Sequence, residues 1–131
     1  MNGIHTRELL VGTPGERMAH TLGDIAYRYA FVSRPIVKLE IAAEKILRFL
    51  LDEFVPAVLC YDTEMRLTAV QEKLLSLISE NYRSIYQFYS KDKSETEKLY
   101  LRLLLVTDEI CGMTDSYARR LYQELSGQWQ G

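Results

Sequence analysis

Apolar residues recur every three or four positions along most of this chain, and in two segments they cover a second side as well. One stripe in residues 34–54 consists of Ile36, Leu39, Ala43, Leu47, Leu50 and Phe54. The apolar residues off that stripe are Val37, Ile41 and Phe49. This spacing is that of one face of an α-helix, and a helix that is apolar on two sides is normally buried on two sides. We therefore predict an all-α fold.

Local start and stop signals divide the chain into a bundle of about four predicted helices, two of them long. Ser94 and Glu97 have the spacing of a capping box ahead of the last helix, as Thr13 and Glu16 have ahead of the first. Pro56 is expected to break or kink the second helix. The residues expected to cap the four helices are Thr13, Ser33, Asp62 or Thr63, and Ser94. The predicted helices span about 14–32, 34–54, 64–89 and 95–126.

With 131 residues, the chain has the length of one domain. We predict a single helical domain over 1–131, with residues 1–12 loosely structured. In its last helix, a continuous stripe comprises Leu99, Leu103, Val106, Ile110, Met113, Tyr117 and Leu121, whereas Leu101, Leu104 and Leu105 fall outside it. A free four-helix bundle has polar outer faces. The extra apolar faces are therefore expected to contact a missing domain or another subunit.

The overall charge and the termini limit the function classes. The formal net charge is -2, whereas nucleic-acid binding usually needs a basic surface that displaces counterions. The first residues have no apolar signal core, and no apolar run approaches the roughly 18 residues of a membrane span. We expect a soluble, cytoplasmic protein without membrane contact, and no DNA binding by this segment alone.

The chain offers few groups for catalysis or metal binding. Its two histidines, His5 and His20, have no neighbouring Asp and no zinc-type spacing. The glycine-containing stretch 12–17 lacks the lysine of a phosphate-binding loop. No nucleophile with a base and an orienting group is apparent. We expect no catalytic residue and no bound metal in this chain.

Glu40 is the charged residue closest to the main apolar stripe of the second predicted helix. It lies one turn after Ile36 and shares a flank with Ala43 and Leu47. A carboxylate near a buried face needs a partner. Two interpretations stay open at this point: an ion-paired boundary residue, or a carboxylate that accepts hydrogen bonds from a ligand in a polar pocket.

Two motifs together resemble a known family. Residues 110–118 read ICGMTDSYA, which resembles the I-x-G-M-T-D-x-Y-A segment near the C-terminus of bacterial deoxyguanosine triphosphate triphosphohydrolases (dGTPases). Residues 29–40 read YAFVSRPIVKLE, similar to that family's H-V-F-S-H-P-x-V-x-x-L-E. The motifs occur in the family's order, and the resemblance covers about residues 20–126.

The resemblance implies an all-α enzyme of the HD superfamily that hydrolyses a dNTP to the deoxynucleoside and tripolyphosphate. These enzymes are oligomeric, and some bind single-stranded DNA. Their divalent metal, Mg²⁺ or Mn²⁺, is held by a His, a His-Asp pair and an Asp, all N-terminal to the part matched here. This chain has no His-Asp dipeptide, so we predict that it is inactive alone, because nothing would activate water or clamp the triphosphate.

The resemblance also implies roles for individual residues. It places Glu40 at the nucleotide pocket and makes Arg66 the candidate for an arginine supplied across a subunit contact. Within its helix Gly112 costs about 1 kcal/mol relative to Ala, which indicates the close approach of another helix. We expect Thr114 and Asp115 to bond to a neighbouring helix. The predicted structural motif comprises Gly112, Met113, Thr114, Asp115 and Tyr117.

These expectations combine into one reading and two rivals. The first is the C-terminal helical part of a dNTP triphosphohydrolase, which walls the nucleotide pocket, supports homo-oligomerisation and needs a missing N-terminal HD core. The main rival is a stand-alone helical interaction or regulatory module without catalytic activity. A weaker one is a metal-independent nucleotide-binding domain.

Overall fold

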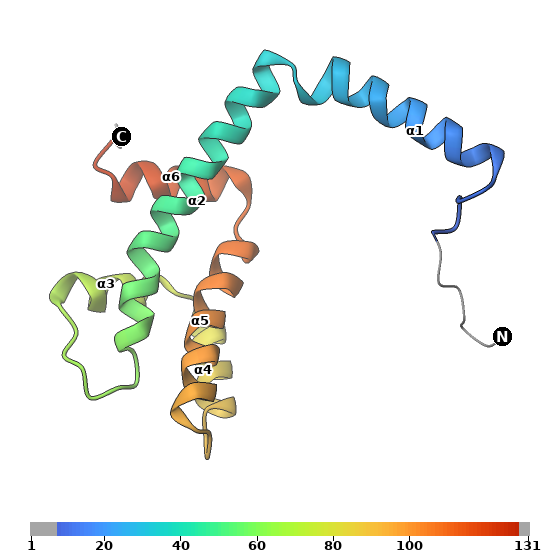
Figure 1. Ribbon diagram of the computed structural model, residues 1–131. Helices are drawn as coiled ribbons and strands as arrows, with labels where there is room; N and C mark the ends of the chain where they lie inside the picture. The colour runs from blue at the N-terminus through green and yellow to red at the C-terminus, as the bar shows by residue number, and fades with distance from the viewer. Residues whose placement is uncertain (1–7, 129–131) are drawn as a thin grey trace, which may run out of the picture. The chain divides into compact units, whose positions relative to one another are not determined.

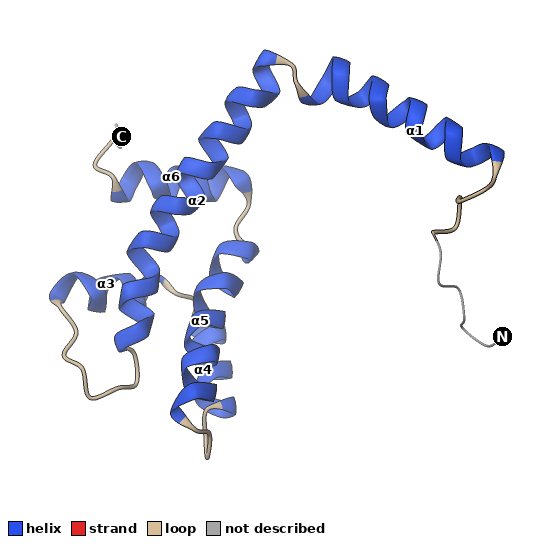
Figure 2. Cartoon of the chain, viewed as in Figure 1, coloured by secondary structure: helices blue, strands red, loops and turns tan. Residues whose placement is uncertain are grey.

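The computed structural model describes residues 8–128, and every regular element within them is helical (Figures 1 and 2). The prediction of an all-α fold is confirmed. What the sequence predicted for residues 1–7, including His5, lies outside the described residues. The elements are α1 (Pro14–Ala26), the π-helical segment η1 (Tyr27–Phe31), α2 (Arg34–Cys60), α3 (Ala69–Leu77), α4 (Glu80–Tyr89), α5 (Glu95–Gly112) and α6 (Asp115–Leu125).

Where the sequence predicted one helical domain, contacts group the chain into two compact units, and the boundary between Ala42 and Ala43 falls inside α2. The first unit contains α1, η1 and the start of α2. None of the residues of α1 and η1 is buried. The second unit contains the rest of α2 and α3 to α6, and all of the buried apolar side chains among the described residues.

The core of the second unit is built by five helices and one linker residue. Its most deeply buried large side chains are Leu50 and Phe54, with 0% and 1% of their surface exposed. Helices α4 and α5 lie side by side (Figure 1). The buried apolar residues are Leu50, Phe54, Ala57 and Val58 of α2, Leu74 and Leu75 of α3, Ile78, Tyr86 of α4, Leu105 and Val106 of α5, and Leu121 of α6.

The span predicted as one helix over 64–89 contains two shorter helices. Residues 61–68 form a loop, and α3 and α4 are separated at Ile78 and Ser79. Ile78 is extended at φ -68° and ψ 133° and is 1% exposed. The backbone N–H of Ser79 donates to Glu109 Oε2 of α5 at 2.8 Å. Burial of Ile78 and this long-range hydrogen bond account for the break, which no proline or glycine marks.

The span predicted over 95–126 is also divided, between Gly112 and Asp115. Met113 is extended at φ -75° and ψ 143° and packs against the core. Thr114 is the N-cap of α6, and its side chain accepts from the Tyr117 backbone N–H. A threonine at an N-cap satisfies one of the free N–H groups of the following helix, and so it favours a new helix here.

The predicted end of the second helix near Pro56 is wrong, because α2 continues through Pro56 to Cys60. A proline inside a helix costs about 3 kcal/mol. The residues that follow it, Ala57 and Val58, are each 0% exposed in the core. The burial of these apolar side chains stabilises the helix and offsets the cost of the proline, which explains why α2 continues past Pro56.

The predicted caps have mixed outcomes. The Ser94–Glu97 capping box of α5 is confirmed. At α1, by contrast, Thr13 makes no side-chain cap, and its hydroxyl donates to the Leu10 carbonyl at 2.7 Å. Neither Asp62 nor Thr63 caps α3. That helix starts at Ala69 with a capping box formed by Thr68 and Gln71.

Candidate functional site

Glu40 lies on the part of α2 that belongs to the first unit, and its side chain is exposed. The apolar residues beside it on the predicted stripe, Ile36 and Leu39, are 36% and 66% exposed. Among the described residues no hydrogen bond or ion pair involves the Glu40 carboxylate.

Arg66 lies in the second unit, in the loop between α2 and α3, and its side chain is exposed. Both of its neighbours in the chain are held. The Met65 backbone N–H donates to Thr63 Oγ1 at 3.2 Å, and Leu67 packs against the core. The loop thus presents a guanidinium group between two fixed residues.

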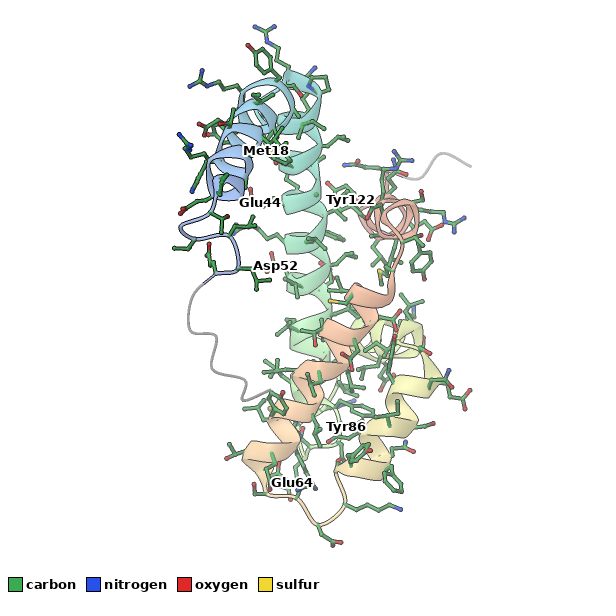
Figure 3. The ribbon with its side chains drawn as sticks, turned by 90° about the vertical axis from the view of Figure 1, so that its right-hand side faces the viewer. Met18, Glu44, Asp52, Glu64, Tyr86 and Tyr122 are labelled. Atoms are coloured by element: carbon green, nitrogen blue, oxygen red, sulfur yellow. The ribbon has the colours of Figure 1, made fainter. Side chains whose placement is uncertain are left out.

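A partly buried polar cluster lies at the start of this loop. Tyr86 points from α4 into the second unit beside α5 and is 3% exposed (Figure 3). Its hydroxyl donates to Asp62 Oδ2 at 2.9 Å. The Tyr86 and Tyr61 rings are 5.3 Å apart and tilted by 60°. A hollow of about 300 Å³ beside the cluster is lined by Tyr61, Asp62, Tyr86, Gln87 and Ser90.

Arg102 of α5 completes this cluster. Its side chain is 5% exposed, and Nη1 donates to the Tyr61 carbonyl at 3.4 Å. Nη2 lies 3.7 Å from the exposed carboxylate of Glu95, while Nε has no hydrogen-bond partner within residues 8–128. A buried charge without partners would be costly, so these contacts hold the guanidinium in place.

The electrostatics of the cluster keep Tyr86 protonated. Burial raises the pKa of Tyr86 to about 12, and the hydrogen bond and negative charge of Asp62 act in the same direction, whereas Arg102 opposes them. At neutral pH the phenol therefore acts only as a hydrogen-bond donor to Asp62, and it is no candidate for a general base. The cluster holds the chain in place at Tyr61 and Asp62.

The run from Gly112 to Tyr117, predicted as a structural motif, contains the junction between α5 and α6. A Cβ atom on Gly112 would lie 2.8 Å from the Tyr82 hydroxyl of α4, a close approach of the kind expected from the sequence. Thr114 bonds to Tyr117 within its own helix, not to a neighbouring helix as predicted. Asp115 is an acidic residue in the first turn of α6, where its negative charge interacts favourably with the helix dipole.

The divalent metal implied by the family resemblance does not fit the residues described. Within residues 8–128 there is no group of three or more His, Cys, Asp or Glu side chains that could hold a metal ion. As for membranes, no helix in the described range is long and apolar enough to cross one.

The sequence motifs did not indicate Asp62, Tyr86 and Arg102 as a group. A signal for Arg102 does exist: it stands three residues after Leu99 and four before Val106, at positions that share a helix face. Its partner Tyr61 is 41 residues away, and periodicity within one helix cannot identify such a partner.

Comparison with known proteins gives one consistent result. The chain is 46% identical over 129 residues to a deoxyguanosinetriphosphate triphosphohydrolase-like protein of Listeria monocytogenes. A protein of the same description from Listeria innocua gives the same identity. No protein-family model matches the chain, and no solved structure does.

The match covers different shares of this chain and of the Listeria proteins. It covers 97% of this chain but 28% of each Listeria protein, so the chain spans less than a third of the length of these relatives. The resemblance carried by the two motifs is confirmed: over nearly all of its length, this chain matches a segment of deoxyguanosinetriphosphate triphosphohydrolase-like proteins.

Proposed function

We propose that this chain is the C-terminal helical part of a dNTP triphosphohydrolase, which converts a dNTP to the deoxynucleoside and tripolyphosphate. The observation that carries the proposal is the 46% identity over 97% of the chain to proteins named for dGTP hydrolysis. The order of the motifs at 29–40 and 110–118 supports the same assignment. The protein is proposed to be cytoplasmic.

In this proposal the chain binds and orients substrate, and the bond is broken elsewhere. The HD core that holds the divalent metal belongs to a polypeptide outside this segment. Glu40 would accept hydrogen bonds from a hydroxyl or base of the nucleotide, and Arg66 would contact the phosphates of a nucleotide bound by another subunit. The exposed side chains of both residues fit such roles.

The proposal also includes oligomer and core contacts. Met18 and Leu22 of α1 are 67% and 56% exposed. Apolar side chains gathered on one helix face indicate a contact surface. We propose that the HD core, or a second subunit of a homo-oligomer, covers them. Single-stranded DNA is not a proposed partner of this segment, because its net charge is -2.

A chimera tests the proposal directly. The matched segment of the Listeria monocytogenes protein is replaced by this chain, and release of tripolyphosphate from each of the four dNTPs is measured. We expect hydrolysis by the unmodified protein and by the chimera, and none when the segment is deleted. A folded chimera without hydrolysis, beside an active Listeria protein, would contradict the proposal.

Glu40 has its own test in this chimera. Glu40→Gln should raise the KM for the dNTP about tenfold, because a hydrogen bond to a charged group is lost. The matched control is Glu44→Gln, one turn later on α2, where Glu44 is exposed and pairs with Arg48 at 2.9 Å. Equal KM values for the two variants would contradict the role proposed for Glu40.

The alternative is a stand-alone helical interaction or regulatory module. The exposed apolar side chains of α1 fit this alternative as well. An evolved module should be monodisperse in size-exclusion chromatography and should not bind a hydrophobic dye. A segment of a larger enzyme should self-associate or bind the dye.

A further inference from the structure

The buried side chains of Tyr86 and Arg102 bond to Asp62 and Tyr61, at the beginning of the loop 61–68, and this loop carries Arg66. We propose that Tyr86 and Arg102 are positioning residues for Arg66. They do so by fixing Tyr61 and Asp62, the first two residues of the loop. The inference rests on the proposed function, because only there does Arg66 meet a nucleotide.

The first step is the anchoring of the loop at its beginning. Asp62 has a positive φ of 53°, a left-handed conformation that is uncommon for residues other than glycine, although Asp adopts it more readily than most. Tyr86 supplies a hydrogen bond of 2.9 Å to the Asp62 carboxylate, and Arg102 supplies one of 3.4 Å to the Tyr61 carbonyl. Two helices therefore hold two successive residues of the loop.

The rest of the loop is held by hydrogen bonds of Thr63 and Gln71. Thr63 donates from Oγ1 to the Cys60 carbonyl at 2.8 Å and accepts from the Met65 N–H. At the other end Gln71, part of the α3 capping box, donates to the Pro56 carbonyl of α2 at 3.4 Å. Arg66 is thus an exposed residue on a loop that is fixed on both sides.

Fixing the loop affects how strongly the Arg66 guanidinium can bind an anion. A flexible loop would lose conformational entropy when its arginine meets a phosphate. A fixed loop has already lost that entropy, so its guanidinium binds an anion more tightly. The hydrogen bonds to Asp62 and Tyr61 give the buried side chains of Tyr86 and Arg102 a role at the beginning of the loop.

Trypsin cleavage of the 131-residue chain tests the anchoring independently of activity. The enzyme cuts after Arg66 only when the loop is mobile. We expect Tyr86→Phe to speed cleavage of the bond between Arg66 and Leu67 about tenfold, since a hydrogen bond to a charged group is lost. Cleavage after Lys73 inside α3 should not change. Tyr89→Phe is the control, because Tyr89 is on the same helix and 57% exposed.

Two results would overturn the anchoring. One is an unchanged cleavage rate at Arg66. The other is an equal increase at Arg66 and Lys73, which would mean that Tyr86 only stabilises the second unit as a whole. Arg102→Lys keeps the charge but loses the planar donor, and we expect it to behave like Tyr86→Phe.

A double-variant experiment in the Listeria chimera tests the role of the positioning. Tyr86→Phe should raise KM for the dNTP and leave kcat unchanged. Added to Arg66→Ala, it should change KM by less than about twofold, because both substitutions act on the same contact. Additive effects would overturn the positioning role. If no chimera hydrolyses a dNTP, the proposed function fails, and the trypsin result still decides whether the loop is anchored.

Discussion

The two units of this chain share the same apolar helical period but use it differently. In the first unit Leu22 of α1 is 56% exposed, whereas in the second unit Leu50 of α2 is 0% exposed. Both residues lie on regular apolar stripes in the sequence. An apolar stripe therefore predicts a helix and a contact face, but it does not say whether the contacting residues belong to the same chain.

The largest expected difference between the units comes from one substitution made in each. Leu50→Ala should lower the free energy of unfolding by about 2–5 kcal/mol, because it removes a fully buried side chain and leaves a cavity. Leu22→Ala should change it by less than about 0.5 kcal/mol. Urea denaturation followed by circular dichroism measures both. Similar effects would contradict the description of α1 as an exposed helix.

A second prediction concerns alkaline pH and the second unit alone. The pKa of Tyr86 is about 12, above its ordinary value of 10.0. Between these pH values Tyr86 loses its proton in the unfolded chain but keeps it in the folded chain. The contribution of Tyr86 to the free energy of unfolding is therefore fully present below pH 10 and is lost as the pH rises toward 12. The slope should be about 1.4 kcal/mol per pH unit. Denaturation at several pH values measures it, and Tyr86→Phe should make the curve flatter.

A smaller effect is expected at the junction of α5 and α6. Thr114→Ala removes the N-cap of α6 and should cost about 1 kcal/mol. Thr107→Ala is the matched control. Thr107 lies inside α5, and its hydroxyl donates only within that helix, to the carbonyls of Leu104 at 3.1 Å and Leu103 at 3.5 Å. If the two variants unfold at the same urea concentration, the cap contributes nothing measurable.

The smallest effect on stability is expected from a charge on α1. Leu22→Glu should leave the free energy of unfolding within about 0.5 kcal/mol of the original, yet it should lower hydrophobic-dye binding. His20→Glu adds the same charge to the opposite side of the same helix, where His20 is exposed, and should leave dye binding unchanged. An equal loss of fluorescence in both variants would indicate a charge effect and not a specific apolar face.

The sequence predicts features that depend on neighbours in the chain. The capping box of Ser94 and Glu97 was predicted and is present, since its signal lies within four residues. The breaks before Ser79 and Thr114 were missed, although a serine and a threonine stand there as possible caps, because the apolar period continues across both. What decides these breaks is packing with other helices, such as the contact between Ser79 and Glu109.

The buried faces and the polar cluster were predicted less well for the same reason. Leu105 is 3% exposed although it lies off the predicted stripe, while Leu99 on the stripe is 38% exposed. A helix with two apolar sides does not reveal which side its own chain covers. The contact between Asp62 and Tyr86 joins residues 24 positions apart. The roles of Glu40 and Arg66 come from the family resemblance and stay predictions.

We propose that the first unit is covered by the rest of a dNTP triphosphohydrolase. Hydrogen exchange of the α1 backbone amides, in the 131-residue chain and in the Listeria chimera, tests it most directly. We predict that exchange in α1 becomes on the order of tenfold slower, or slower still, in the chimera, because the apolar face is covered there. Equal exchange rates in both proteins, with a folded chimera, would contradict the claim.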